Sequence, residues 1–255
     1  MNIIRGSILK NSCLIWAIFR ETGMNDRIEG YVLTQSDYRD ADVLMQVLCK
    51  DYGVLSLIAR SAKKITSKNH CLPMCRYEFI IDYKDNKTIY TIHSRKLLSN
   101  HFEDKDIVMM SFKNVLAELV LKNREMDLYD DFSFVFEKLN SGNMYLLGSL
   151  FLSGIIRRFG IAPMVDGCVI CGNKKVAALS NRHGGFLCLD HLNGEPVQDV
   201  DALKKFRLIN KAEFKNYDAI KDIGFAFRNF DQLMSFYLDN SDLKLKSYDF
   251  YRSLV

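Results

Sequence analysis

Short apolar runs alternate with polar punctuation between positions 27 and 94, where Asp, Lys, Asn and Gly separate stretches rich in Val, Ile, Leu and Tyr. The runs are RIEGYVLT (27–34), VLMQVLCK (43–50), GVLSLIAR (53–60), RYEFIIDY (76–83) and TIYTIHS (88–94). Runs of this length and composition predict β-strands. Five strands over so short a stretch predict a small barrel, either an oligonucleotide-binding (OB) barrel or an SH3-like barrel, which would give nearly the same pattern.

From position 103 onward the apolar residues recur every three or four positions, which predicts amphipathic helices. One stripe lies between 143 and 160, where Gly160 and Pro163 supply stop signals. A second stripe nearer the end predicts another packing helix. Such stripes normally face a domain interior, and an exposed slot for a partner peptide is the alternative. The stripes are Leu147, Leu150, Phe151, Ile155 and Phe159, and then Ile220, Ile223, Phe227, Phe230, Met234 and Tyr237.

The first 23 residues form a segment of their own. Its apolar run, 13–19, is too short to span a bilayer and is followed at once by charged residues, so it predicts neither a transmembrane segment nor a signal peptide. Met24 opens a stretch, MNDRIEGYVL, that resembles a natural protein start. Residues 1–23 are therefore either an upstream extension or the result of a start codon placed too early. The competing interpretation is an added amphipathic helix, in which Trp16, the one tryptophan, would favour docking.

Cysteine and histidine spacing gives the most specific signal in the chain. The segment CVICGNKKVAALSNRHGGFLCLDH has the pattern C-x2-C-x16-C-x2-H, formed by Cys168, Cys171, Cys188 and His191. Two such pairs can converge on one ion, and four protein ligands close the tetrahedron, so the spacing predicts one structural zinc ion rather than a catalytic one. Gly172 permits the tight turn after the first pair. His183 is the alternative fourth ligand.

The remaining cysteines favour a reducing compartment. Cys13, Cys49, Cys71 and Cys75 lack the regular spacing of a secreted disulfide scaffold, so we predict a cytoplasmic protein. Cys71 and Cys75 lie beside His70, but no fourth candidate ligand is near, which favours buried or loop thiols over a second metal site.

Positive charge is concentrated in the predicted barrel. Residues 24–102 hold 12 Lys and Arg against 9 Asp and Glu, within a chain whose net charge is +4. The cluster ARSAKKITSK, after the third strand, contains Arg60, Lys63, Lys64 and Lys68 and no acidic residue. Such a loop can follow a phosphate backbone without reading bases, although a merely solvated basic loop has the same composition.

Sequence motifs argue against an enzyme. A zinc nucleobase deaminase needs H-x-E upstream of P-C-x-x-C, and in this chain the residue before Cys168 is glycine rather than proline. It also lacks a P-loop, a dinucleotide-binding fingerprint and a nucleophile elbow. We therefore predict a binding protein, with a zinc-stabilised adaptor that contacts only other proteins as the alternative to a DNA-binding protein.

Ordered local matches from Met24 onward resemble the RecO family of bacterial recombination mediator proteins. EGYVLTQSDYRDADVLMQVLCKDYGVLSLIARSAKK is similar to the first barrel strands of the family, and RRFGIAPMVDGCVICG and GGFLCLDH to its zinc knuckle. YLDNSDLKLKSYDFY resembles its terminal motif, in which a helix ends before Leu245, Lys246 and Ser247. The resemblance implies an α+β protein with a five-stranded OB barrel at 24–102, followed by a helical domain at 103–255 with an embedded zinc finger at 168–191.

The resemblance also implies a non-catalytic DNA repair protein. Members of the family bind single- and double-stranded DNA, anneal complementary strands, and cooperate with RecR to load RecA onto DNA coated by single-strand binding protein. By resemblance, the residues that contact phosphates are Arg60, Lys63, Lys64 and Lys68, with Arg39 and Arg95 as weaker candidates.

Family members also bind the acidic, hydrophobic tail of single-strand binding protein through the helical domain. Arg157 and Arg158, beside Ile155, Ile156 and Phe159, form the candidate receptor for this tail. The alternative is that both arginines are solvated residues at a helix carboxy-terminus. Two departures from the family pattern stand out: His191 replaces a cysteine, and Tyr248 follows the LKS tripeptide, where relatives often carry arginine.

Overall fold

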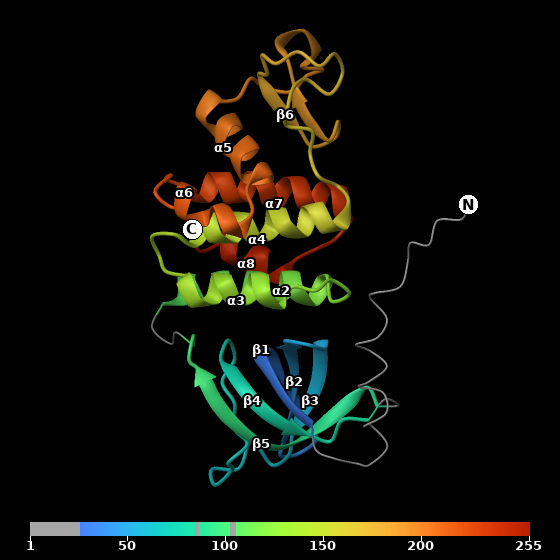
Figure 1. The fold of residues 1–255 in the computed structure, drawn as a ribbon, viewed down its shortest axis with the longest axis vertical. Coiled ribbons are helices and arrows are strands. Elements are labelled where there is room, and N and C mark those ends of the chain that lie inside the picture. Colours follow the sequence, from blue (N-terminus) through green and yellow to red (C-terminus); the bar gives the residue numbers. More distant parts are fainter. Residues whose placement is uncertain (1–25, 85–86, 103–105) are drawn as a thin grey trace, which may run out of the picture. The chain divides into compact units, whose positions relative to one another are not determined.

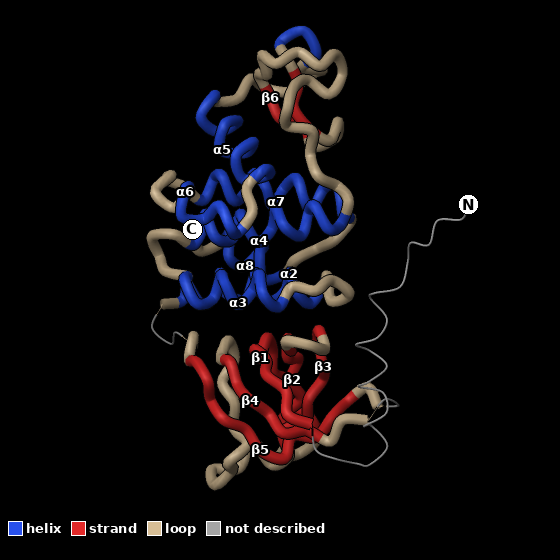
Figure 2. Tube along the Cα trace, viewed as in Figure 1, coloured by secondary structure: helices blue, strands red, loops and turns tan. Residues whose placement is uncertain are grey.

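The chain folds into two compact units, a first unit that extends to Asn100 and a second from His101 to Val255. A computed structural model describes residues 26–84, 87–102 and 106–255 (Figure 1). The extension expected at residues 1–23 lies outside this range. Strands make up the first unit and helices dominate the second (Figure 2).

The first unit is a closed barrel with the strand order β1-β2-β3-β5-β4. All neighbouring pairs are antiparallel except β3 and β5, and β1 pairs with both β2 and β4 to close the barrel. This is an OB-like topology, which decides between the two predicted barrels. The strands are β1 (Asp26–Tyr38), β2 (Asp42–Cys49), β3 (Gly53–Ala59), β4 (Arg76–Ile81) and β5 (Ile89–Ser99).

Alternation along the strands builds the barrel core. In β4 every second side chain, including Tyr77, Phe79 and Ile81, is buried, which is the two-residue period of a strand with one face inward. Gly30 sits where β1 crosses β2 closely, because a Cβ atom there would lie 2.6 Å from Val47 Cγ1. A glycine is therefore required for β1 and β2 to pack at this point.

The second unit is mainly helical. Within it α2 packs against α8, and α4 against α7, with Phe112 of α2 in ring contact with Phe230 at 5.2 Å and Tyr251 at 5.4 Å. Its helices are α2 (Ile107–Lys122), α3 (Tyr129–Lys138), α4 (Met144–Phe159), α5 (Val200–Lys211), α6 (Tyr217–Ile220), α7 (Phe227–Ser241) and α8 (Lys246–Arg252), joined by the short 3-10 turns η1 (Leu189–His191) and η2 (Phe214–Asn216).

The first predicted apolar stripe lies on α4 and faces the core of the helical unit, with one exception. Its members are buried except Phe159, which is 40% exposed at the last turn. The helix ends at Gly160, whose φ of 82° is left-handed, as the stop signal predicts. The second stripe also packs inward except at Ile223 and Phe227, which are half-buried. The single helix expected for this stripe is wrong, because Ile220 ends α6 and α7 begins only at Phe227. The non-helical segment 221–226, which contains Gly224, interrupts the helix while the apolar spacing continues across it.

Helix α8 is tied to α2 by one carboxylate. Glu118 accepts hydrogen bonds from the backbone N–H of Lys246 and of Ser247, at 3.2 and 2.8 Å, and from the Ser247 hydroxyl. This carboxylate caps the start of α8 across the fold. Tyr248, where relatives often carry arginine, is buried and donates a hydrogen bond to Asp231, which also pairs with Arg252 at 3.3 Å.

A small ribbon interrupts the helices between α4 and α5. It consists of β6 (Ala178–Ser180) and β7 (Gly185–Leu187), which pair antiparallel next to the amino-terminal end of α5 (Figure 1). Across residues 26–84, 87–102 and 106–255, none of the helices has the length and apolar character needed to span a bilayer.

Candidate metal centre and candidate nucleic-acid interface

Two tight turns bring the predicted metal ligands together at the ribbon. The backbone N–H of Gly172 donates to the carbonyl of Cys168 at 2.8 Å, and that of His191 donates to the carbonyl of Cys188 at 3.1 Å. Gly172 has a φ of 74°, the left-handed conformation that its place in the motif predicts. Each turn therefore points its two ligand side chains toward the other pair.

The four ligand atoms of Cys168, Cys171, Cys188 and His191 lie within 4.8 Å of one another. The Cys171 and Cys188 sulfurs are 3.7 Å apart, and His191 Nδ1 lies 3.7 Å from Cys168 Sγ and 3.2 Å from Cys188 Sγ. A tetrahedron with metal–sulfur bonds of about 2.3 Å has edges of about 3.8 Å. Three sulfurs and one imidazole at these spacings fit a four-coordinate metal ion with no position left for substrate.

The surroundings of the cluster shift the pKa values of two of its thiols. Burial opposes ionisation of Cys168, but hydrogen bonds from the backbone of Cys171, Cys188 and Ile170 prevail and lower its pKa to about 6. Burial raises the pKa of Cys188, and the neighbouring sulfurs of Cys171 and Cys168 raise it further. A divalent cation would relieve this crowding because metal ligation requires the thiolate form.

The alternative ligands lie elsewhere. His183 is on the β6–β7 turn, where its Nδ1 lies 2.9 Å from the Ser180 hydroxyl, and it is absent from the ligand cluster. Cys75 is buried and donates to Asn100 Oδ1 at 3.0 Å, and burial raises the pKa of Cys71 to about 12. Within the described ranges no group of three metal-ligating side chains forms around these two thiols.

The predicted basic cluster lies on the long loop between β3 and β4. Its first part is pinned to the β1–β2 turn, because the N–H of Lys63 donates to the carbonyl of Ala41 at 3.1 Å and the N–H of Ser61 to Asp42 Oδ1 at 2.8 Å. A hydrogen-bonded turn follows, from the N–H of Ser67 to the carbonyl of Lys64 at 2.9 Å. The loop therefore presents its cations on an ordered backbone.

These cations are not electrostatically equivalent. Lys63 Nζ lies 2.9 Å from Asp37 Oδ2, so its charge is partly neutralised. Arg60, Lys64 and Lys68 are exposed, and no ion pair involves them within the described part of the chain. The loop therefore offers three cations whose charge is uncompensated by a neighbouring carboxylate.

The two weaker candidates differ in accessibility. Arg39 is exposed in the β1–β2 turn, with a φ of 51° and its guanidinium 5.2 Å from the Tyr38 ring. Because the loop is pinned to this turn, Arg39 lies at the same end of the barrel as the basic cluster. Arg95 is half-buried on β5, with its guanidinium 5.3 Å from the Tyr77 ring and its Nε buried without a hydrogen-bond partner among the described residues.

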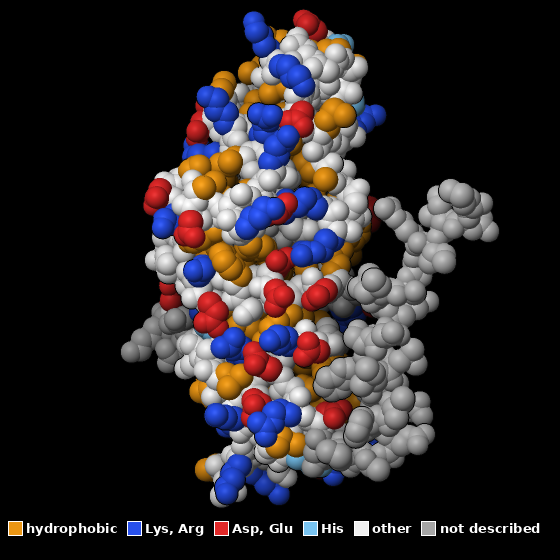
Figure 3. All heavy atoms as spheres, viewed as in Figure 1, with side chains coloured by type: hydrophobic (Ala, Val, Ile, Leu, Met, Phe, Trp, Pro, Cys, Tyr) orange, Lys and Arg blue, Asp and Glu red, His pale blue; other side chains and the backbone are white. Residues whose placement is uncertain are grey.

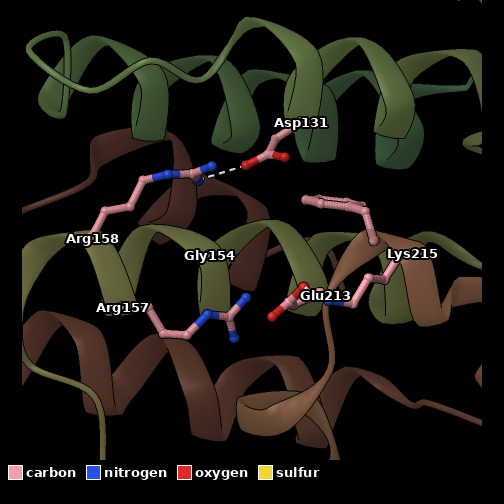
Figure 4. Close-up of a pocket in the computed structure, with 7 residues that line it drawn as sticks. Asp131, Gly154, Arg157, Arg158, Glu213 and Lys215 are labelled. Carbon is pink, nitrogen blue, oxygen red and sulfur yellow. Dashed lines mark ion pairs between the residues drawn. The ribbon is translucent and has the colours of Figure 1, made fainter. Parts of the chain in front are cut away.

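In the helical unit Arg157 and Arg158 line a hollow of about 350 Å³ (Figure 4). Arg158 extends toward Asp131 of α3 and pairs with it at 2.5 Å. Arg157 donates to the Ser153 hydroxyl at 2.6 Å and to the carbonyl of Asn210 at 3.3 Å, and burial lowers its pKa. The hollow is lined by Asp131, Gly154, Arg157, Arg158, Glu213, Phe214 and Lys215.

The walls of this hollow differ from the apolar slot that the sequence suggested. Ile155 and Ile156 are buried in the core and do not line it, and Phe214 is the large apolar side chain in the wall. Lys215 adds a third cation, which the sequence analysis missed because 57 positions separate it from Arg158 and no local pattern joins the two.

Comparison with known proteins assigns the family. Residues 24–101 match the family model described as recombination protein O N terminal, and residues 104–233 match recombination protein O C terminal. Relatives named DNA repair protein RecO include those of Exiguobacterium sibiricum (28% identity, covering 66% of this chain and 71% of the relative), Thermoanaerobacter sp. (23%, 89% and 97%) and Limosilactobacillus fermentum (26%, 74% and 75%). The chain belongs to the RecO family of DNA repair proteins.

Proposed function

We propose that this protein is a non-catalytic recombination mediator that binds single- and double-stranded DNA and anneals complementary strands. The observation that carries the proposal is the ordered loop on the OB-like barrel, with Arg60, Lys64 and Lys68 exposed and uncompensated. In OB folds the β1–β2 loop contributes to the oligonucleotide surface, and here that turn holds Arg39 and is hydrogen-bonded to the basic loop. Neutralised backbones repel less while their bases remain free to pair.

Partner proteins extend the proposal on family grounds. With RecR, the protein would help to load RecA onto DNA coated by single-strand binding protein, in the cytoplasm and in association with the nucleoid. The acidic, hydrophobic tail of single-strand binding protein would bind at the hollow lined by Arg157, Arg158 and Lys215, with Phe214 as its apolar contact.

The metal ion in this proposal is zinc. Three cysteines and one histidine form the typical donor set of a structural zinc site. In that role Cys168, Cys171, Cys188 and His191 would hold the ribbon together, and the ion would supply stability rather than reactivity.

Annealing tests the proposal directly. Complementary strands, each precoated with cognate single-strand binding protein, are mixed with the protein, and duplex formation is followed by fluorescence. We expect the wild-type protein to accelerate annealing and a Lys64→Glu/Lys68→Glu variant to lose most of the acceleration. A Lys221→Glu/Lys244→Glu variant, which makes the same charge change on exposed residues of the helical unit, is the matched control and should anneal normally.

The outcomes separate a mediator from an adaptor that contacts only proteins. If the wild-type protein neither anneals strands nor binds DNA at low salt, the adaptor is the better description. If the loop variant and the control lose activity equally, net charge rather than the barrel loop controls annealing, and the site assignment is wrong.

A further inference from the structure

A second cleft, distinct from the hollow at Arg157, lies between α5 and the β6–β7 ribbon that carries the candidate metal ligands. Its volume is about 420 Å³. One wall is a single face of α5, because positions 200, 203, 204 and 207 recur at helical spacing. The other wall is the chain on either side of the first cysteine pair. The lining residues are Val165, Asp166, Gly167, Lys174, Lys175, Val176, Phe186, Val200, Leu203, Lys204 and Arg207.

The cleft has an apolar floor and positively charged side chains on both of its walls. Phe186 and Leu203 form a buried floor, and Val200 at the mouth is 61% exposed. In Figure 3, Lys and Arg side chains gather around hydrophobic patches over α5 and the ribbon. Cations stand on both walls: Lys174 and Lys175 on the ribbon side, and Lys204 and Arg207 on α5.

One carboxylate opposes these four cations. Asp166 accepts a hydrogen bond from Arg207 at 2.8 Å and pairs with Lys211 at 2.6 Å, and these two cations lower its pKa to about 2. The carboxylate is therefore ionised at neutral pH, and the lining keeps a net positive charge. Lys175 and Lys204 are exposed and have no ion pair in the described ranges.

Hydrogen bonding at the ribbon disfavours an extended peptide as the occupant. Peptides commonly bind a sheet by adding a strand to a free edge. Here Gln198 covers the outer edge of β6: its Oε1 accepts from the N–H of Leu179 at 3.3 Å, and its backbone N–H donates at 2.9 Å to the carbonyl of Ala177, just before the strand. The outer edge of β7 is bonded to Met164, whose carbonyl accepts from the N–H of Phe186 at 3.0 Å. The cleft can therefore bind a ligand through its charge and apolar floor, but not through a free sheet edge.

We propose that this cleft is a second nucleic-acid site, which holds a single strand with its phosphates on the cations of both walls and a base against the apolar floor. The inference rests on the proposed function and deepens it. Annealing needs two strands to be held at once, and a site on the helical unit in addition to the barrel loop lets one molecule hold both. Cationic grooves that offer contact to bases bind single strands with little sequence preference.

Bridging of two oligonucleotides tests this site with the full-length protein. One strand is attached to a bead, and a second, non-complementary strand is labelled. The protein is added, and the label that it retains on the bead is measured. We expect the wild-type protein to bridge the strands, a Lys175→Gln/Lys204→Gln variant to lose bridging but still bind one strand, and the Lys221→Gln/Lys244→Gln control to behave as wild type. These four side chains are exposed, so the fold should tolerate the changes.

Salt dependence adds a quantitative readout. Loss of two phosphate contacts should make the slope of log affinity against log salt shallower by about 1.4 for single strands. Between 50 and 200 mM salt, the affinity of the variant should therefore fall about sevenfold less than that of the wild-type protein. A Val200→Ala variant keeps every charge and should weaken binding without changing the slope.

The outcomes distinguish this site from the proposed function. If the wild-type protein binds no DNA, both ideas are wrong. If it binds DNA but the Lys175→Gln/Lys204→Gln variant bridges strands with an unchanged slope, only the second site is wrong. If that variant instead loses affinity for an acidic peptide and keeps full DNA binding, the cleft is a peptide site and the inference is overturned.

Discussion

Replacing Asp37 by asparagine should strengthen DNA binding by the barrel and make it more sensitive to salt. Asp37 lies 2.9 Å from Lys63 Nζ and is the one carboxylate paired with a cation of the basic loop in the described part of the barrel. An exposed ion pair contributes only about 0–1 kcal/mol to stability. The substitution should therefore leave the barrel folded and release Lys63 to contact a phosphate.

Counterion release gives the size of the effect. Each phosphate contact with a single strand contributes about −0.7 to the slope of log affinity against log salt. Contacts from Arg60, Lys64 and Lys68 would give a slope of about −2.1, and release of Lys63 would make it about −2.8. Between 50 and 200 mM salt, binding by the loop should weaken about 18-fold in the wild-type protein and about 50-fold in the variant.

Fluorescence anisotropy of a labelled oligothymidylate, measured over a salt series, provides the assay. The matched control is Asp51→Asn, which removes the same charge from the β2–β3 turn at the other end of β3. The seven residues of β3 span about 20 Å, well beyond the Debye length of about 10 Å, so the control should not alter the slope. An unchanged slope for Asp37→Asn, or an equal change for Asp51→Asn, would refute the reasoning.

Four further substitutions test the helical unit. Cys188→Ser should reduce bound zinc from about one ion per chain to none by atomic absorption, whereas His191→Cys should retain it, since four thiolates also complete a zinc tetrahedron. Gly148→Ala places a Cβ atom 2.5 Å from Phe112 Cζ and should destabilise the unit by about 1–3 kcal/mol, seen as a lower urea midpoint. Glu118→Ala removes the cap of α8 and should cost about 1–3 kcal/mol in the same assay. An unchanged midpoint for either substitution would contradict the packing or the capping described above.

Local signals in the sequence predicted the elements well, and features that join distant residues less well. The five strands followed from the length and composition of their apolar runs, but an OB barrel and an SH3-like barrel share that pattern and differ in strand order. The structure distinguishes the two, because β3 pairs in parallel with β5 and β1 closes the barrel on β4, which is the OB-like strand order. The metal ligands were predictable because each pair spans only four positions of the chain.

The site residues show the same limit. Composition identified the basic loop but could not separate Lys63 from Lys64, because the carboxylate paired with Lys63 lies on β1, 26 positions away. The cleft beside α5 left no signal in the sequence, since its walls come from residues 165–176 and 200–207 and from Phe186. The break before Phe227 was missed because apolar spacing continued across Gly224 and concealed the end of the helix.

The carboxylate that caps α8 also bears on how the protein is made. Glu118 on α2 has its hydrogen-bond partners in a later part of the chain, which begins at Lys246. At a synthesis rate of about 5–20 residues per second, the ribosome reaches α8 roughly 6–25 s after it completes α2. During that interval the face of α2 that carries Phe112 lacks its α8 neighbour Tyr251, while all five strands of the barrel have already been synthesised. The nascent helical unit is therefore the stage at which chaperones would be most needed.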